Sequence, residues 1–152
     1  MKRLIAIAAL ACGLAACAST GRLSGTERLE LYRAHAGEPV RDFRYYGSLN
    51  GWTELGDSAL AVWTRPSEAW LLELGGPCMD LSFAPAISVT NMMGQVSARF
   101  DTVIVRGGST SHGVPCRIQT IRPLDVKALR VSEKQLREAK VEAREAGQTP
   151  TN

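Results

Sequence analysis

The sequence has few of the residues from which metal and cofactor sites are built. It contains only two histidines, His35 and His112, which are far apart in the chain, and four cysteines. A zinc site needs a closely held set of such ligands, so this distribution predicts no metal site. The glycine pairs at 75–76 and 107–108 match neither of the common phosphate-binding templates, so we expect no nucleotide cofactor.

Paired carboxylates for acid–base catalysis are also missing. Three aspartates lie beside expected turns, but each stands alone in the sequence: Asp57, Asp80 and Asp101. Aspartate is common in turns because its carboxylate accepts hydrogen bonds from nearby backbone N–H groups. We therefore interpret all three as turn residues.

The sequence lacks both a long hydrophobic run and a dense basic tract. The apolar N-terminal stretch, residues 4–16, has about 13 residues, whereas a membrane-spanning helix needs about 20. Basic and acidic residues are interspersed along the rest of the chain, which predicts no nucleic-acid partner. We expect no polybasic membrane patch either.

The N-terminal stretch has the features of an export signal. Lys2 and Arg3 precede the short apolar run, and the run ends in Leu14-Ala15-Ala16-Cys17. These four residues resemble the lipobox of a bacterial lipoprotein, in which small residues let the peptidase approach and the cysteine thiol takes a diacylglycerol. Residues 1–16 are then a signal peptide, and Cys17 becomes the acylated first residue of the mature chain.

Two other interpretations of this stretch were weighed. One is an ordinary signal peptide with a coincidental cysteine. The other is acylation at Cys12, but that cysteine lacks a large apolar residue three positions earlier. Ala18, rather than Asp, follows Cys17, which resembles the pattern of lipoproteins sorted to the outer membrane. We therefore expect a lipid anchor at the periplasmic face of the outer membrane, followed by a short polar tether at residues 17–25.

Removing the signal peptide changes the charge and the cysteine count. Without Lys2 and Arg3, 16 basic and 15 acidic residues remain, so the formal charge falls from +3 to +1. With Cys12 removed and Cys17 acylated, Cys78 and Cys116 are left in an oxidising compartment, where a disulfide is the default. Such a bond closes a loop of about 39 residues and contributes at most about 4 kcal/mol in the chain-entropy model. The alternative is a redox-active pair, which usually needs more closely spaced cysteines.

The apolar pattern predicts a helix first and then mostly strands. Residues 26–36 have helical spacing, with Thr26 as the expected N-cap and Gly37 as the stop. Residues 59–64 are apolar on both faces and predict a central strand, which a turn at 65–68 joins to a strand at 69–74. Asn50 and Gly51 form a two-residue turn signal between two further strands, 41–46 and 52–55. The remaining strands are expected at 86–90, 95–100, 102–106 and 116–121, with turns at 56–58 and 91–94 and a loop at 107–115.

A second helix is expected after Pro123, with Asp125 as its cap and its end near Ala146. Val126 and Leu129 face the sheet, while the second half is mostly charged and is interpreted as a solvated helix rather than a partner-binding one. The predicted fold is therefore mainly β. It is one small antiparallel barrel or curved sheet at residues 26–124, with a short N-terminal helix and a charged C-terminal helix and tail at 125–152.

Five segments resemble a family of small Gram-negative lipoproteins that is catalogued only as a domain of unknown function. The resemblance covers roughly residues 27–130, and the charged segment after Arg130 looks outside it. The pairing of Cys78 with Cys116 fits the family pattern, but the resemblance implies no activity or cofactor. The matching segments are residues 47–56, 60–64, 70–78, 96–105 and 115–128.

Candidate functional side chains are few. His112, with Ser109 or Ser111 and Asp101, has the residue types of a hydrolytic triad, but its glycine-rich loop predicts no rigid nucleophile elbow. His35 is expected to act at a helix end. Trp63 and Trp70 are expected in the core. Trp52 is expected there too, with a recognition surface as the alternative. The Met92–Met93 pair is expected at a tolerated turn tip.

These observations predict a non-enzymatic, lipid-anchored accessory or interaction module of the cell envelope. Its partners are membrane lipid, through Cys17, and an envelope protein or glycan that the sequence does not identify. The alternative is a small β-barrel that binds an apolar or amphipathic ligand, such as a lipid or glycan fragment, with a pocket lined by Trp52 or Trp63. An envelope hydrolase using His112 is the third and least favoured hypothesis.

Overall fold

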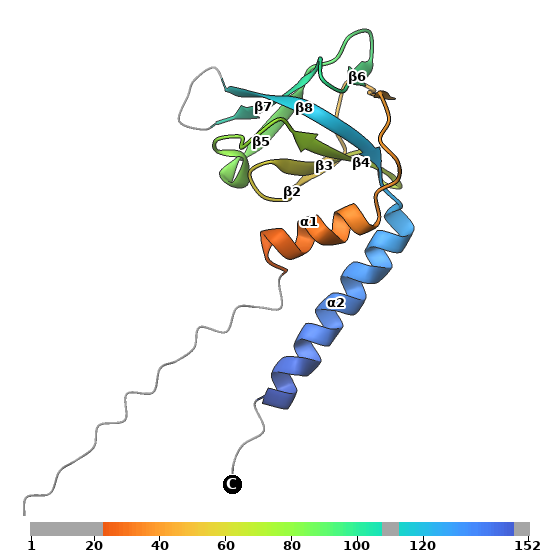
Figure 1. The fold of residues 1–152 in the computed structure, drawn as a ribbon, viewed down its shortest axis with the longest axis vertical. Coiled ribbons are helices and arrows are strands. Elements are labelled where there is room, and N and C mark those ends of the chain that lie inside the picture. Colours follow the sequence, from red (N-terminus) through yellow and green to blue (C-terminus); the bar gives the residue numbers. More distant parts are fainter. Residues whose placement is uncertain (1–22, 108–112, 148–152) are drawn as a thin grey trace, which may run out of the picture.

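The computed structural model describes residues 23–107 and 113–147. Within them, eight strands form two antiparallel sheets, with one α-helix before and one after the strands (Figure 1). The predicted mainly-β fold with terminal helices is therefore confirmed. In chain order the elements are α1 (Gly25–Ala34), β1 (Asp42–Arg44), β2 (Gly51–Glu54), β3 (Ala59–Arg65), β4 (Glu68–Leu74), η1 (Leu81–Phe83), β5 (Ala86–Val89), β6 (Gln95–Ser97), β7 (Thr102–Arg106), β8 (Val114–Pro123) and α2 (Val126–Gly147).

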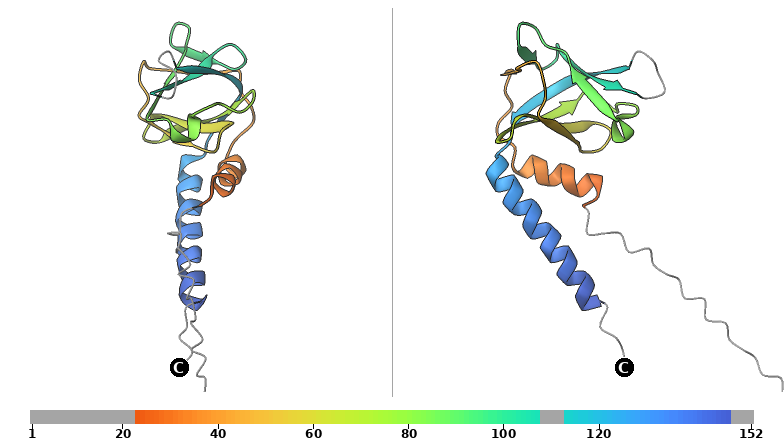
Figure 2. Two further views of the ribbon diagram at one scale, coloured as in Figure 1. Left: turned by 90° about the vertical axis from the view of Figure 1, so that its left-hand side faces the viewer. Right: turned by 180° about the vertical axis from the view of Figure 1, so that it is seen from behind.

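The larger sheet has the strand order β2-β3-β4-β8-β7-β5 and curls into a half-barrel (Figures 1 and 2). The ten-residue β8 makes this curl possible because its first half pairs with β7 and its second half with β4. Strands β1 and β6 form the second sheet. Phe43 of β1 and Val96 of β6 are buried among the core residues of the larger sheet, so the small sheet closes its open side.

The hairpin of β3 and β4 is the predicted one, joined by a turn at Pro66 and Ser67. Both of its faces are covered. Leu60 and Val62 of β3 point into the half-barrel core, whereas Ala59 and Ala61 point to a second core on the outer face. Apolar residues on both faces of this strand therefore correspond to two separate cores, as expected for a central, covered strand.

The two helices cover the outer face of the hairpin. Leu31 and Tyr32 of α1, with Val126 and Leu129 of α2, are buried in the outer core. Both helices lie on the same side of the β domain, and the later turns of α2 project away from it (Figure 1). Asp125 caps α2 as expected, since its Oδ1 accepts a hydrogen bond from Ala128 N at 2.9 Å.

The predicted cap of α1 is wrong by two residues. Ser24, not Thr26, is the N-cap, and it forms a capping box with Glu27. Both bonds are present, because Glu27 N donates to Ser24 Oγ at 3.2 Å and Ser24 N donates to Glu27 Oε2 at 2.7 Å. The Glu at the third position makes Ser24 the better cap, since it satisfies the backbone N–H of Ser24 reciprocally.

The Asn50–Gly51 hairpin turn is also wrong. β2 pairs with β3 and not with β1, whose partner is β6. Neither Asn50 nor Gly51 has a positive φ; Gly47 has one instead, at 87°. β1 is only three residues long, and its central residue Phe43 is 2% exposed and pairs with Val96 of β6, so a long-range pairing replaces the local hairpin.

The turn before β6 is present, but its strands do not pair with each other. Met92 and Gln95 bond each other through both backbone groups at 2.9 Å around Met93 and Gly94, which both have positive φ. The strand before this turn, β5, pairs with β7, while β6 pairs with β1. The expected return strand at 95–100 is therefore shorter, at Gln95–Ser97, and lies in the other sheet.

Candidate functional site

Several predicted site residues lie outside the described residues. They are the lipidation residue Cys17 with its lipobox, and His112 with the serines beside it. Asp101, the third member of that hypothetical triad, is described, and its carboxylate is already occupied. It accepts hydrogen bonds from Ser97 N and Thr90 Oγ1, both at 2.7 Å, which is the turn-stabilising role predicted for it.

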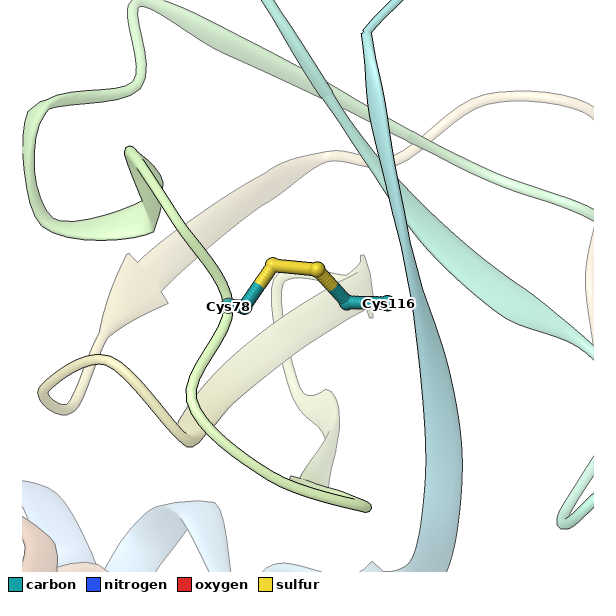
Figure 3. The surroundings of a disulfide bond; sticks show 2 residues. All are labelled: Cys78 and Cys116. Carbon is teal, nitrogen blue, oxygen red and sulfur yellow. A yellow bond between two sulfur atoms is a disulfide. The ribbon is translucent and has the colours of Figure 1, made fainter.

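The predicted disulfide is present between Cys78 and Cys116 (Figure 3). Their Cα atoms are 5.7 Å apart, and the bond joins the segment after β4 to β8. Cys78 is only 2% exposed and belongs to the half-barrel core, with Cys116 packed against it. A bond buried in this way is typical of a structural disulfide rather than an exposed redox pair.

His35 is at the end of α1, as predicted, and contributes its backbone N–H to the C-cap. Its side chain has a further role that the sequence did not indicate. Nε2 lies 2.9 Å from Ser132 Oγ of α2, so the imidazole links the two helices.

The three tryptophans are all half-buried. Trp70 stacks on Phe43, with ring centroids 5.1 Å apart, and packs against the half-barrel core. Trp52 packs against the same core, while Trp63 packs against the outer core. The predicted core positions are therefore approximately right, but Trp52 and Trp63 also line a surface groove.

This groove, which we call the helix-side groove, lies between the β2 edge of the sheet and the two helices. Its volume is about 480 Å³. Gly51, Thr53 and Trp63 contribute from the sheet; the absent side chain at Gly51 leaves space in front of Trp63, since a Cβ there would lie 4.0 Å from the indole Cδ1. The helices contribute charged and polar side chains to the groove: Arg28, Tyr32, Arg130, Glu133 and Arg137.

Hydrogen bonds hold the side chains of this groove in place. Arg28 Nη2 donates to Glu54 Oε1 at 2.7 Å, and Arg130 Nη2 donates to the Pro66 carbonyl at 2.6 Å. Tyr32 Oη donates to Glu133 Oε1 at 3.1 Å. Burial is the main cause that raises the pKa of Tyr32 to about 12, and the negative charge of Glu133 adds to it. The phenol therefore stays protonated and remains a hydrogen-bond donor.

The groove combines aromatic and charged side chains. The Arg130 guanidinium lies 5.7 Å from the centre of the Trp63 ring, so the aromatic face is flanked by positive charge. Three arginines and one glutamate line the groove, together with two tryptophans. Tryptophan faces suit sugar rings and apolar groups, and guanidinium groups suit carboxylates and phosphates.

The interior of the half-barrel has a different character. In the part of the chain that the structure describes, it is filled by side chains with 0% exposure: Leu60, Val62, Leu72, Val96, Val103, Ile118 and Ile121. A ligand-binding barrel needs a hollow of several hundred cubic ångströms in that place. The groove lined by Trp52 and Trp63 therefore lies outside this filled interior.

Comparison with known families decides the relationship of the chain. A family model described as "Family of unknown function (DUF6491)" matches residues 1–140. The chain belongs to this family. The match confirms the resemblance to a domain of unknown function but extends beyond 27–130. The expectation that the segment after Arg130 lies outside the family is therefore wrong for residues 131–140, whereas residues 141–152 lie outside the match. Searches of curated proteins and of solved structures found no match.

Among residues 23–107 and 113–147, no group of three or more histidine, cysteine, aspartate or glutamate side chains is placed to hold a metal ion. No helix in the same ranges combines the length and the apolar character that crossing a bilayer requires.

The sequence analysis missed the polar walls of the groove. The charged and polar side chains come from α1 and α2, which are about 100 residues apart in the chain. Arg28 and Tyr32 lie on α1, whereas Arg130, Glu133 and Arg137 lie on α2. Each arginine alone resembles an ordinary solvated helix residue. One feature of the sequence pointed to the groove, namely Gly51 beside Trp52. Gly51 was interpreted as part of a turn instead.

Proposed function

We propose that this protein is a lipid-anchored, non-enzymatic module of the cell envelope, held at the periplasmic face of the outer membrane through Cys17. The observation that carries the proposal is the lipobox-like Leu14-Ala15-Ala16-Cys17 after a short apolar run with a basic start. The family match includes these residues, so the segment belongs to the region that the family shares. A buried disulfide between Cys78 and Cys116 agrees with export to an oxidising compartment.

The non-enzymatic part of the proposal is supported by how the polar side chains are used. Asp101 holds a turn, His35 bonds Ser132, and Glu133 bonds Tyr32. These groups serve structural contacts. His35 and Ser132 have the residue types of a base and a nucleophile, but their hydrogen bond links α1 to α2. An accessory or interaction role requires a surface that a partner can contact, and the described residues form such surfaces.

The experiment is fractionation of cells that express the full chain with Cys17→Ser. The wild-type protein is expected in the outer-membrane fraction, and the variant, which has no acyl chains, is expected in the soluble periplasmic fraction. Cys12→Ser is the matched control and is expected to fractionate as the wild type does. Membrane association of Cys17→Ser equal to that of the wild type would refute the anchor.

A second candidate function is binding of an anionic glycan fragment in the helix-side groove. The specific observation in its favour is the combination of Trp63 with Arg28, Arg130 and Arg137 around about 480 Å³ of space. Titration of the protein with an oligosaccharide of uronic acids, followed by tryptophan fluorescence, tests it. The acidic oligosaccharide is expected to change the emission, and its neutral counterpart is not. An identical response to both, or no response, removes this function.

A further inference from the structure

The turn between β6 and β7 contains a strained residue. Arg99 has φ of 70°, in the left-handed region, where a side chain with a Cβ is disfavoured. Strain of this kind persists only where the surrounding structure enforces it, and it is frequent at functional positions.

The surrounding structure does enforce it. Arg99 N donates to the Ile118 carbonyl at 2.7 Å, and Arg117 Nη1 donates to the Arg99 carbonyl at 2.7 Å. On the other side of the turn, the Asp101 carboxylate binds Ser97 N and Thr90 Oγ1. Hydrogen bonds to β8, within the turn and to Thr90 therefore hold the turn in one conformation.

The consequence of this conformation is the display of Phe100. Its side chain is 83% exposed, although a phenylalanine gains free energy from burial. Beside it lies a surface hollow of about 550 Å³, whose lining includes Val40, Arg41, Phe100 and Gln119. Gln119 marks an irregularity of the sheet, because the β4–β8 register shifts there and leaves it without a paired residue. Such bulges are common beside functional sites.

The charge of this surface is basic. Arg41 and Arg99 both line the hollow and are exposed, and neither makes an ion pair with a carboxylate within the described ranges. The acidic residue of the hollow, Asp42, accepts a hydrogen bond from Gln95 Nε2 at 3.2 Å. Carboxylates and apolar side chains on a partner would complement these groups.

We propose that the Phe100 surface, formed by Val40, Arg41, Arg99, Phe100 and Gln119, docks an acidic, apolar segment of another envelope protein. Phe100 is the apolar anchor, and the guanidinium groups of Arg41 and Arg99 pair with carboxylates of that segment. This inference rests on the proposed function as an interaction module, but it does not depend on the lipid anchor.

A protein partner fits this surface better than a bilayer does. A hollow beside a rigid, protruding aromatic residue accommodates an inserted side chain, whereas a membrane surface offers none. Lipid-binding basic clusters usually contain four to eight lysines and arginines, whereas the proposal uses two arginines. The backbone of the turn is already held by hydrogen bonds, so it loses little conformational entropy on binding, which favours a specific partner.

Site-specific photocrosslinking in intact cells tests the proposal. The full chain carries a photoreactive phenylalanine analogue in place of Phe100, and a second chain carries it in place of Phe83. Phe83 is the matched control because it is 90% exposed, lies on η1 and does not line the hollow. Each chain is also made with Arg41→Glu and Arg99→Glu, and intact disulfide and circular dichroism show that these variants fold.

The expected result is one protein adduct from position 100 and none of the same size from position 83. The partner peptide in that adduct contains acidic residues, and its yield falls about tenfold in the Arg41→Glu, Arg99→Glu chain. A lipid adduct at position 100, the same adduct at both positions, no adduct at position 100, or an adduct that survives charge reversal would overturn the proposal. Fractionation of the same cells reports the anchor separately, so failure of the docking surface and failure of the anchor are distinguishable.

Discussion

At the scale of single residues, one bond reinforces the fold and one backbone conformation strains it. The Cys78–Cys116 disulfide ties the segment after β4 to β8, across 38 positions of sequence. Arg99 holds a left-handed conformation that glycine adopts without cost. Both features are attached to β8, because Cys116 lies on that strand and Arg99 is hydrogen-bonded to Ile118 and Arg117. The disulfide stabilises the fold, whereas the strain at Arg99 destabilises it.

Replacing both Cys78 and Cys116 by serine is expected to destabilise the protein by about 4 kcal/mol at most, because the unfolded chain regains the freedom of the open loop. Urea unfolding of the wild type and the double variant, without reductant, measures the difference. Adding reductant under denaturing conditions should shift the midpoint of the wild type and leave that of the variant unchanged. Equal midpoints for the two proteins without reductant would contradict the structural role of the bond.

Arg99→Gly is expected to raise the free energy of unfolding by up to about 1 kcal/mol. A residue with a Cβ in the left-handed conformation costs about 1–2 kcal/mol, which glycine avoids. Part of this gain is lost because glycine has greater conformational freedom in the unfolded chain. Arg99→Ala removes the guanidinium but keeps the Cβ, so it is the control and should give no such gain. A loss of stability in the glycine variant would show that the Arg99 side chain, rather than its backbone, holds the turn.

The residue scale also shows where sequence reasoning succeeds and fails. The disulfide was predictable because the proposed export signal, with an acylated Cys17, leaves only one pair of cysteines. Strain at Arg99 was not, since arginine has no preference for positive φ and the conformation is imposed by β8. Gly51 was predicted to form a hairpin turn with Asn50, but it has no positive φ and begins β2 opposite Trp63.

At the scale of elements, the two helices are connected by polar contacts along their length. His35 meets Ser132, Tyr32 meets Glu133, and Glu27 accepts from Lys140 Nζ at 2.8 Å. Apart from its buried first residues, α2 is therefore held to α1 by single hydrogen bonds. The contact between Glu27 and Lys140 is also an ion pair, so it depends on the charge of Glu27.

The contact between Glu27 and Lys140 is expected to weaken in acid. The hydrogen bond from Lys140, first, and those from Ser24 lower the pKa of Glu27 from 4.5 to about 2. Because the folded pKa lies below the unfolded one, the stabilisation is present above about pH 4.5 and is lost as the pH falls toward 2. NMR observation of the Glu27 carboxyl resonance between pH 6 and pH 2 measures the pKa of this group. The range covers about four pH units around the usual glutamate pKa.

Lys140→Gln is the informative variant for this contact. It removes the principal cause of the shift, so the pKa of Glu27 should move back toward 4.5, while the capping box with Ser24 keeps part of the effect. Lys134→Gln on the same helix is the control, because Lys134 pairs with Glu138 within α2 and should leave Glu27 unchanged. An unchanged pKa in Lys140→Gln would contradict the contact between the helices.

Elements were predicted better than their pairings. Alternating apolar residues located β4, β7 and β8, because each strand has a face that a core covers, and apolar residues on both faces located β3 between two cores. The pairing of β1 with β6 was not predictable, since it joins residues such as Phe43 and Val96 that local turn signals do not connect. The helix-side groove was missed for the same reason, because its walls come from α1, β2 and α2.

At the scale of the whole molecule, two candidate contact surfaces lie on different parts of the fold. The helix-side groove is bounded by α1 and α2, whereas the Phe100 surface is formed by the segment before β1, the β6–β7 turn and β8. Membership of the family does not supply an activity. The proposed role as an anchored module therefore depends on what the N-terminus becomes in the cell.

The most direct test is the intact mass of the protein purified from membranes. The account predicts a mature chain that begins at Cys17, retains the Cys78–Cys116 bond and is heavier than its polypeptide by the mass of the diacylglycerol on the Cys17 thiol. Cys17→Ser should lack this added mass. A wild-type chain that begins elsewhere, or begins at Cys17 without lipid, would contradict the anchor and with it the central proposal.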